Sequence, residues 1–194
     1  MFKIICVTNR KLCVGDFTDR IAELYKNGVT VILREKDLPE SEYIELTRRV
    51  IKVCPDVIIH SYVNAAKEFG VRKIHLPLHM MNENIGSDFE TVGISVHSDE
   101  EAVRAEKLGA SYITAGHIFA TDCKKGVAPR GTEFLKSVVS SVNIPVYGIG
   151  GISPRNIGLI KETGAAGVCI MSGFMQCEDI EKYLAKIGKN VLKK

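Results

Sequence analysis

Residues 145–173 read PVYGIGGISPRNIGLIKETGAAGVCIMSG, and this stretch contains one full copy of the pattern that decides the fold. An apolar run over 145–149 leads through two glycines to Ser153 and Pro154, and proline is favoured at the first position of a helix. The predicted helix ends near Gly164, because glycine readily adopts the left-handed conformation of a helix C-cap. A second apolar run follows over 167–171. The stretch therefore predicts a strand, a helix and another strand.

The same unit recurs along the whole chain. Gly28, Gly70 and Gly109 also stand shortly before apolar runs, as expected where helices end. Runs that are apolar throughout are typical of parallel strands covered by helices. Eight such units predict a compact α/β fold, a (β/α)8 or TIM barrel, as a single domain over residues 1–194. An open doubly wound sheet is the alternative, but residues 8–11 (TNRK) lack the glycine-rich turn that it requires. The predicted strands are 3–8, 30–33, 56–59, 73–76, 91–96, 111–115, 145–149 and 167–171.

The amino-acid composition argues against several classes of protein. The 26 Lys and Arg residues nearly balance the 23 Asp and Glu residues, so no electrostatic footprint for nucleic acid is present. No apolar stretch approaches the ~18 residues of a membrane span, and the first residues lack the features of an export signal. Six cysteines without a CxxC pair suit a reducing compartment. We expect a cytoplasmic protein that binds neither nucleic acid nor membrane.

The ends of the last two predicted strands carry glycine and serine. In a TIM barrel the residues just past the carboxyl ends of the strands line the active site. Gly150 and Gly151 follow the seventh strand, and Ser172 and Gly173 follow the eighth. Backbone N–H groups at the starts of helices attract oxyanions, so these turns predict a phosphate site. The alternative is that the glycine pair only makes a tight turn.

All five histidines fall at or just beyond predicted strand ends. His117, after the sixth strand, is the best candidate for acid–base chemistry, because the usual histidine pKa of ~6.5 lies near working pH. For the other four histidines a structural role is the simpler interpretation. The sequence has no HxH or HExxH motif, and we predict no metal site. Cys123 has no neighbouring base and is taken as inert.

Three segments resemble the thiamine phosphate synthase/TenI superfamily: 33–38 (LREKDL), 148–152 (GIGGI) and 171–174 (MSGF). The resemblance implies one of two branches. In the synthase branch, an Asn-Asp pair after strand three and an acid after strand four hold magnesium diphosphate. Here His60 and Ser61 replace the pair, and residues 75–80 (HLPLHM) contain no acid. Residues 116–126 (GHIFATDCKKG) resemble the loop of the TenI branch, in which the histidine is the proposed proton carrier.

The resemblance to the TenI branch implies a thiazole tautomerase of thiamine biosynthesis. Such an isomerase aromatises the thiazole carboxylate phosphate made by thiazole synthase, with His117 as the catalytic residue. Arg34 and Lys124 are then candidates for binding the substrate carboxylate or for lining the pocket, and Thr121 orients the loop. The turns at Gly150, Gly151, Ser172 and Gly173 hold the phosphate. No cofactor is expected, the partner is a small thiazole phosphate, and family members commonly form homo-oligomers.

Two other functions stay open. The first is a thiamine phosphate synthase, a transferase that couples hydroxymethylpyrimidine diphosphate to thiazole phosphate and binds magnesium through Glu35 or Asp37. The second is a regulatory protein that binds a phosphate ligand and has no catalytic activity.

Overall fold

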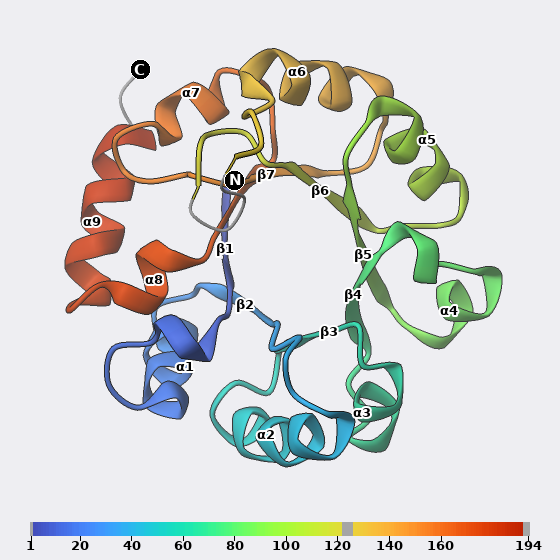
Figure 1. Cartoon of the computed structure of the whole chain (residues 1–194), viewed down its shortest axis with the longest axis vertical. Coiled ribbons are helices and arrows are strands. Elements are labelled where there is room, and N and C mark those ends of the chain that lie inside the picture. The colour runs from blue at the N-terminus through green and yellow to red at the C-terminus, as the bar shows by residue number, and fades with distance from the viewer. Residues whose placement is uncertain (1, 122–125, 192–194) are drawn as a thin grey trace.

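Eight parallel strands form a closed ring with helices around it in the computed structural model, which describes residues 2–121 and 126–191 (Figure 1). Each strand pairs with the next along the chain. β8 returns to β1, with Ile5 in register with Cys169. The predicted TIM barrel is confirmed, and every predicted strand is present with its ends shifted by at most two residues. The strands are β1 (Lys3–Val7), β2 (Thr30–Leu33), β3 (Ile58–His60), β4 (Lys73–Pro77), β5 (Thr91–Val96), β6 (Tyr112–Gly116), β7 (Val146–Ile149) and β8 (Gly167–Ile170).

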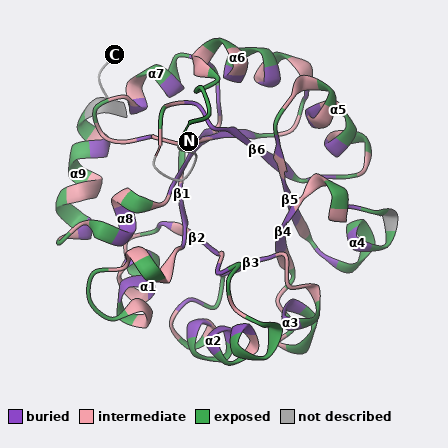
Figure 2. Cartoon of the chain, viewed as in Figure 1, coloured by how far each residue is buried: buried purple, intermediate pink, exposed green. Residues whose placement is uncertain are grey.

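Helices cover the outside of the ring and bury the outward faces of the strands (Figure 2). The four glycines expected at helix ends all have positive φ, between 64° and 89°. At the N-terminus of α5 the Ser98 hydroxyl accepts a hydrogen bond from the backbone N–H of Glu101. This is the first of the two hydrogen bonds that define a capping box. The helices are α1 (Phe17–Lys26), α2 (Glu40–Val53), α3 (Val63–Glu68), α4 (Glu83–Asp88), α5 (Asp99–Lys107), α6 (Gly131–Ser141), α7 (Ile157–Lys161), α8 (Ser172–Gln176) and α9 (Ile180–Val191).

The helix predicted to start at Pro154 begins later, at Ile157. The Asn156 side chain accepts a hydrogen bond from the Ser153 N–H at 2.8 Å and donates one to the Gly151 carbonyl at 2.9 Å. These two bonds hold the intervening residues in a turn. The helix start predicted at Pro154 was therefore three residues too early, because the Asn156 side chain holds residues 153–156 in a turn.

Side chains fill the centre of the barrel. They form a cluster that is separate from the larger layer between strands and helices, and alternate strand residues contribute to it. Because the centre is packed, a ligand can be bound only at one of the two ends of the barrel. The central cluster consists of Ile5, Val7, Ile32, Ile58, Tyr112, Tyr147 and Cys169.

Two expectations from the sequence concern membrane crossing and the state of the cysteines. Among the described residues, no helix combines the length and the apolar character that a membrane crossing requires. The five cysteines that the structure describes are all free thiols.

Candidate active site

His117 lies directly after β6, at the carboxyl end of the barrel. Its residue surface is only 5% exposed. The chain beyond it folds back over β7, since the N–H of Ile118 donates to the Ile149 carbonyl and that of Phe119 to the Gly150 carbonyl, both at 3.0 Å. The His117 carbonyl itself accepts a hydrogen bond from the N–H of Arg130 at 3.0 Å. Backbone contacts on both sides therefore fix the position of the imidazole.

The imidazole of His117 has one engaged and one unengaged nitrogen. Nε2 lies 3.3 Å from the carbonyl oxygen of Val127. A carbonyl oxygen can only accept, so Nε2 carries the proton and Nδ1 carries the lone pair. Nδ1 is buried, and no described residue forms a hydrogen bond with it. Buried polar atoms nearly always have partners, so a basic nitrogen left without one is suited to accept a proton from a bound molecule.

The turn after β7 lies against the loop that carries His117. Gly150 and Gly151 have φ values of 103° and 65°. A Cβ atom on Gly150 would lie 2.4 Å from the His117 Cβ, and one on Gly151 would lie 2.4 Å from the Ala120 carbonyl oxygen. Close packing of the two loops therefore requires both glycines. No described residue accepts a hydrogen bond from the N–H of Gly150 or Gly151, so these donors are available to an anion.

The turn after β8 also contains a glycine in close contact with a neighbouring segment. Ser172 is exposed at the first position of α8, and Gly173 follows it. A Cβ atom on Gly173 would lie 2.0 Å from the Tyr183 hydroxyl on α9, so any larger residue here would have to displace the Tyr183 ring. Packing accounts for the glycines at both turns, and their phosphate-binding role stays a prediction.

The loop after β6 is described in part. Thr121 is half-buried at the end of its first described segment. Lys124 and Cys123 lie outside the described residues. The role of Thr121 in loop orientation and that of Lys124 in substrate binding stay predictions.

Arg34 and Lys36 give one side of the barrel mouth a positive charge. Arg34 follows β2 and continues the alternation of Thr30 and Ile32, which places it on the face that turns toward the barrel interior. Its backbone N–H donates to the Thr8 hydroxyl at 2.8 Å. Partial burial and the nearby Arg34 lower the pKa of Lys36. The segment after β2 therefore brings two neighbouring cations to this side of the mouth.

The two acids in the same segment are held by other cations. Glu35 is 2% exposed and accepts hydrogen bonds from the Thr8 hydroxyl at 2.7 Å and from the Arg10 guanidinium at 3.2 Å. Asp37 forms ion pairs with Arg10 at 2.6 Å and Lys11 at 2.8 Å. Hydrogen bonds from these two cations hold the pKa of Asp37 well below its usual range. These two carboxylates therefore connect the loop after β2 to the loop after β1.

His60 and His75 are neutral and stacked inside the barrel. Their ring centroids are 5.6 Å apart. Burial lowers the pKa of His60 to about 2, with His75 and the cations Lys36 and Arg34 as further causes. Burial, Lys36 and Arg34 lower the pKa of His75 to about 3. Both imidazoles are therefore uncharged at neutral pH and add no positive charge to this side of the mouth.

The placement of His75 differs from the expectation. It lies in the middle of β4 rather than at its end. Its Nδ1 lies 3.0 Å from the Tyr112 hydroxyl, and its Nε2 lies 2.8 Å from the Ser95 hydroxyl. Side chains of β5 and β6 therefore satisfy both of its nitrogens, which makes His75 a structural residue.

The remaining histidines do not gather at one point. His97 is exposed, and its Nδ1 donates to the Gly116 carbonyl at 3.1 Å. His79 is exposed in a short turn after β4. Within the described ranges, no group of three or more His, Cys, Asp or Glu side chains is placed to hold a metal ion.

Two residues at the mouth were not predicted from the sequence. Lys36 is one, although the spacing of residues 32, 34 and 36 places it near Arg34. Arg10 is the other, and it binds Glu35 and Asp37. No local pattern could have revealed this contact, because it joins loops that follow different strands.

Comparisons with known proteins agree on one group. The family model described as "Thiamine monophosphate synthase" (TMP-TENI) matches residues 4–174. The chain is similar to the thiamine-phosphate synthase of Fusobacterium nucleatum, with 34% identity over 97% of this chain and 96% of the relative. It is also 34% identical to that of Clostridium acetobutylicum, over 100% of this chain and 96% of the relative. A solved thiamine phosphate pyrophosphorylase from Pyrococcus furiosus has a TM-score of 0.84 at 30% identity, covering 98% of this chain and 95% of that one.

Proposed function

The chain belongs to the thiamine monophosphate synthase (TMP-TENI) family, and from this premise we propose that it is a thiazole tautomerase, an isomerase that aromatises a thiazole carboxylate phosphate. The observation that carries the proposal is Nδ1 of His117 at the carboxyl end of the barrel, which is buried and has no hydrogen-bond partner among the described residues. A proton transfer within one small molecule requires a single base of this kind.

The reaction consists of two proton transfers by the same nitrogen. Nδ1 of His117 takes the proton from the ring carbon next to the carboxylate, so a C–H bond breaks and an N–H bond forms. The same N–H then delivers a proton to the exocyclic carbon, and the ring becomes aromatic. Nε2 keeps its proton throughout and donates a hydrogen bond to the Val127 carbonyl, which orients the ring. Atoms and charge balance without any other reactant.

Two regions of the mouth suit the two anionic groups of this substrate. The N–H groups of Gly150 and Gly151, with the start of α8 at Ser172, bind the phosphate. Arg34 and Lys36 on the opposite side attract the carboxylate. His117 lies beside the glycine turn, so its imidazole is close to a substrate whose phosphate is bound there.

The residues at the mouth do not fit a magnesium site. Hard divalent cations require oxygen ligands, mainly carboxylates. The positions at which the resemblance places an Asn-Asp pair hold His60 and Ser61, which bind each other through Nδ1 and Oγ at 2.7 Å. Glu35 and Asp37, the other candidates, are engaged with Arg10. We therefore derive no step through a metal ion.

Thiamine phosphate synthesis is the second candidate, and the comparisons favour it. The curated relatives and the Pyrococcus structure are named for that transferase reaction, so their names support it better than the tautomerase. Side chains at the mouth support the tautomerase. The two reactions consume different substrates, and one protein preparation can be tested for both.

The deciding experiment measures both reactions on the wild-type chain. One assay follows the ultraviolet absorbance change as the thiazole carboxylate phosphate becomes aromatic. The other follows pyrophosphate release from hydroxymethylpyrimidine diphosphate, thiazole phosphate and magnesium. We expect aromatisation without pyrophosphate release. Fast pyrophosphate release without aromatisation would establish the synthase, and tight phosphate binding with neither reaction would establish a binding protein.

His117→Gln tests the residue itself. Loss of a general acid–base group lowers the rate of the chemical step by roughly 10²–10⁴-fold. His79→Gln is the matched control, because it removes an exposed imidazole from the turn after β4. An undiminished aromatisation rate in His117→Gln would remove His117 from the mechanism.

A further inference from the structure

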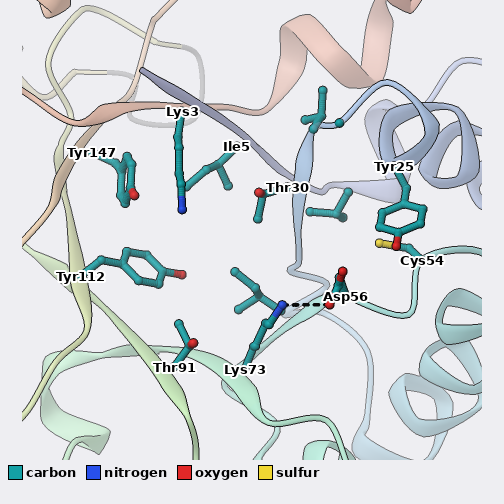
Figure 3. A pocket seen from close by; sticks show the side chains of 14 residues that line it. Lys3, Ile5, Tyr25, Thr30, Cys54, Asp56, Lys73, Thr91, Tyr112 and Tyr147 are labelled. Atoms are coloured by element: carbon teal, nitrogen blue, oxygen red, sulfur yellow. Dashed lines mark hydrogen bonds and ion pairs between the residues drawn. The ribbon is translucent and has the colours of Figure 1, made fainter. Parts of the chain in front are cut away.

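A cavity lies at the amino end of the barrel, opposite the end that carries His117. Its volume is about 330 Å³, near the lower limit of ~300–1,000 Å³ for small-molecule pockets. Its walls come from the first residues of successive strands (Figure 3). Lys3 begins β1, Lys73 begins β4 and Tyr112 begins β6. The packed central cluster separates this cavity from the mouth.

One positive charge in the cavity is not neutralised. The Lys73 ammonium forms an ion pair with Asp56 at 2.9 Å. Lys3 points into the cavity from the other side (Figure 3), and no described residue forms an ion pair with its ammonium. The cavity thus carries a net charge of +1, and a ligand with a single negative charge complements it.

Two tyrosines add apolar ring surfaces to the cavity, and one of them adds a hydroxyl without a partner among the described residues. The rings of Tyr112 and Tyr147 meet edge to face, with centroids 5.4 Å apart. The Tyr112 hydroxyl is bound to His75. Tyr147 is only 5% exposed and lines the cavity, and its hydroxyl has no hydrogen-bond partner among the described residues. This oxygen is not enclosed by protein, so the hydroxyl can donate a hydrogen bond to a ligand in the cavity.

We propose that this amino-end cavity binds a small aromatic monocarboxylate. The carboxylate contacts the Lys3 ammonium and accepts a hydrogen bond from the Tyr147 hydroxyl. The ring of the ligand packs on Tyr112 and on the apolar side chains of Ile5 and Ile58, which also line the cavity. A phosphate dianion fits less well, because Asp56 already neutralises the second lysine.

The test is a titration of ¹⁵N-labelled protein with benzoate, followed by two-dimensional NMR. We expect saturable shifts at the amides of Lys3, Thr91 and Gly167, which lie at the amino end. Shifts confined to Gly150, Gly151 and Ser172 would place benzoate at the other end and overturn the proposal. So would the absence of saturation at millimolar concentrations, or stronger shifts of the same amides with inorganic phosphate.

Variants identify the groups that bind benzoate. Lys3→Gln removes a charge-assisted contact, and we expect about tenfold weaker binding. Tyr147→Phe keeps the ring and should also weaken binding. The control Lys52→Gln removes an exposed lysine on α2 and should leave binding unchanged. Equal affinity in wild type, Lys3→Gln and Tyr147→Phe would overturn the proposal, provided that the three spectra show the same fold.

Discussion

Gly150→Ala is expected to displace His117 without unfolding the barrel. The new Cβ would lie 2.4 Å from the His117 Cβ, whereas ordinary contact begins near 3.4 Å, so the loops must separate by about 1 Å. A displacement of about 1 Å at a catalytic group costs roughly 10²-fold in rate. The φ of 103° adds backbone strain of about 1–2 kcal/mol for alanine. We expect a rate loss near 100-fold with a modest loss of stability.

Gly109→Ala is the matched control for this change. Gly109 has a φ of 89°, and nothing lies within 4 Å of an added Cβ. It therefore shares the backbone strain but not the contact with His117. Urea unfolding should show a loss of about 1–2 kcal/mol for this variant, and its aromatisation rate should match wild type. If Gly150→Ala aromatises the thiazole as fast as Gly109→Ala does, the placement of His117 against this turn is not required for catalysis.

Three further predictions concern stability, and urea unfolding measures each. Tyr43→Phe removes the hydroxyl that donates to the buried Leu33 carbonyl at 2.6 Å, and the loss should be about 1–3 kcal/mol; no change would mean that water replaces the donor. Ile94→Ala empties a fully buried site, and we expect a loss of about 2–5 kcal/mol, with a value below this range indicating collapse of the cavity. The pKa of His75 is about 3 in the folded chain against a usual 6.5, so the unfolded chain binds the extra proton between these values. The free energy of unfolding should therefore fall as pH is lowered through that window, by up to about 1.4 kcal/mol per pH unit. His75→Gln should make this dependence on pH shallower. An unchanged dependence would contradict the lowered pKa of His75.

Much of the site could be located from the sequence, because TIM-barrel strand ends meet at one mouth. His117 and the turn at Gly150 do lie side by side at that mouth. The directions of the side chains could not be predicted. Glu35 follows Arg34 directly, yet Thr8 and Arg10 hold its carboxylate in a buried position. Those partners belong to the loop after a different strand.

The sequence by itself determined the strands, the helix ends and the closed barrel. Apolar runs and glycine caps depend on neighbours within a few residues, so they are visible without tertiary contacts. Only the tertiary structure decided that His75 is a core residue, that packing requires Gly150, and that Lys3 and Tyr147 share a cavity. Each of these facts depends on which residues of separate strands come into register when the sheet closes, and that register is a property of the whole ring.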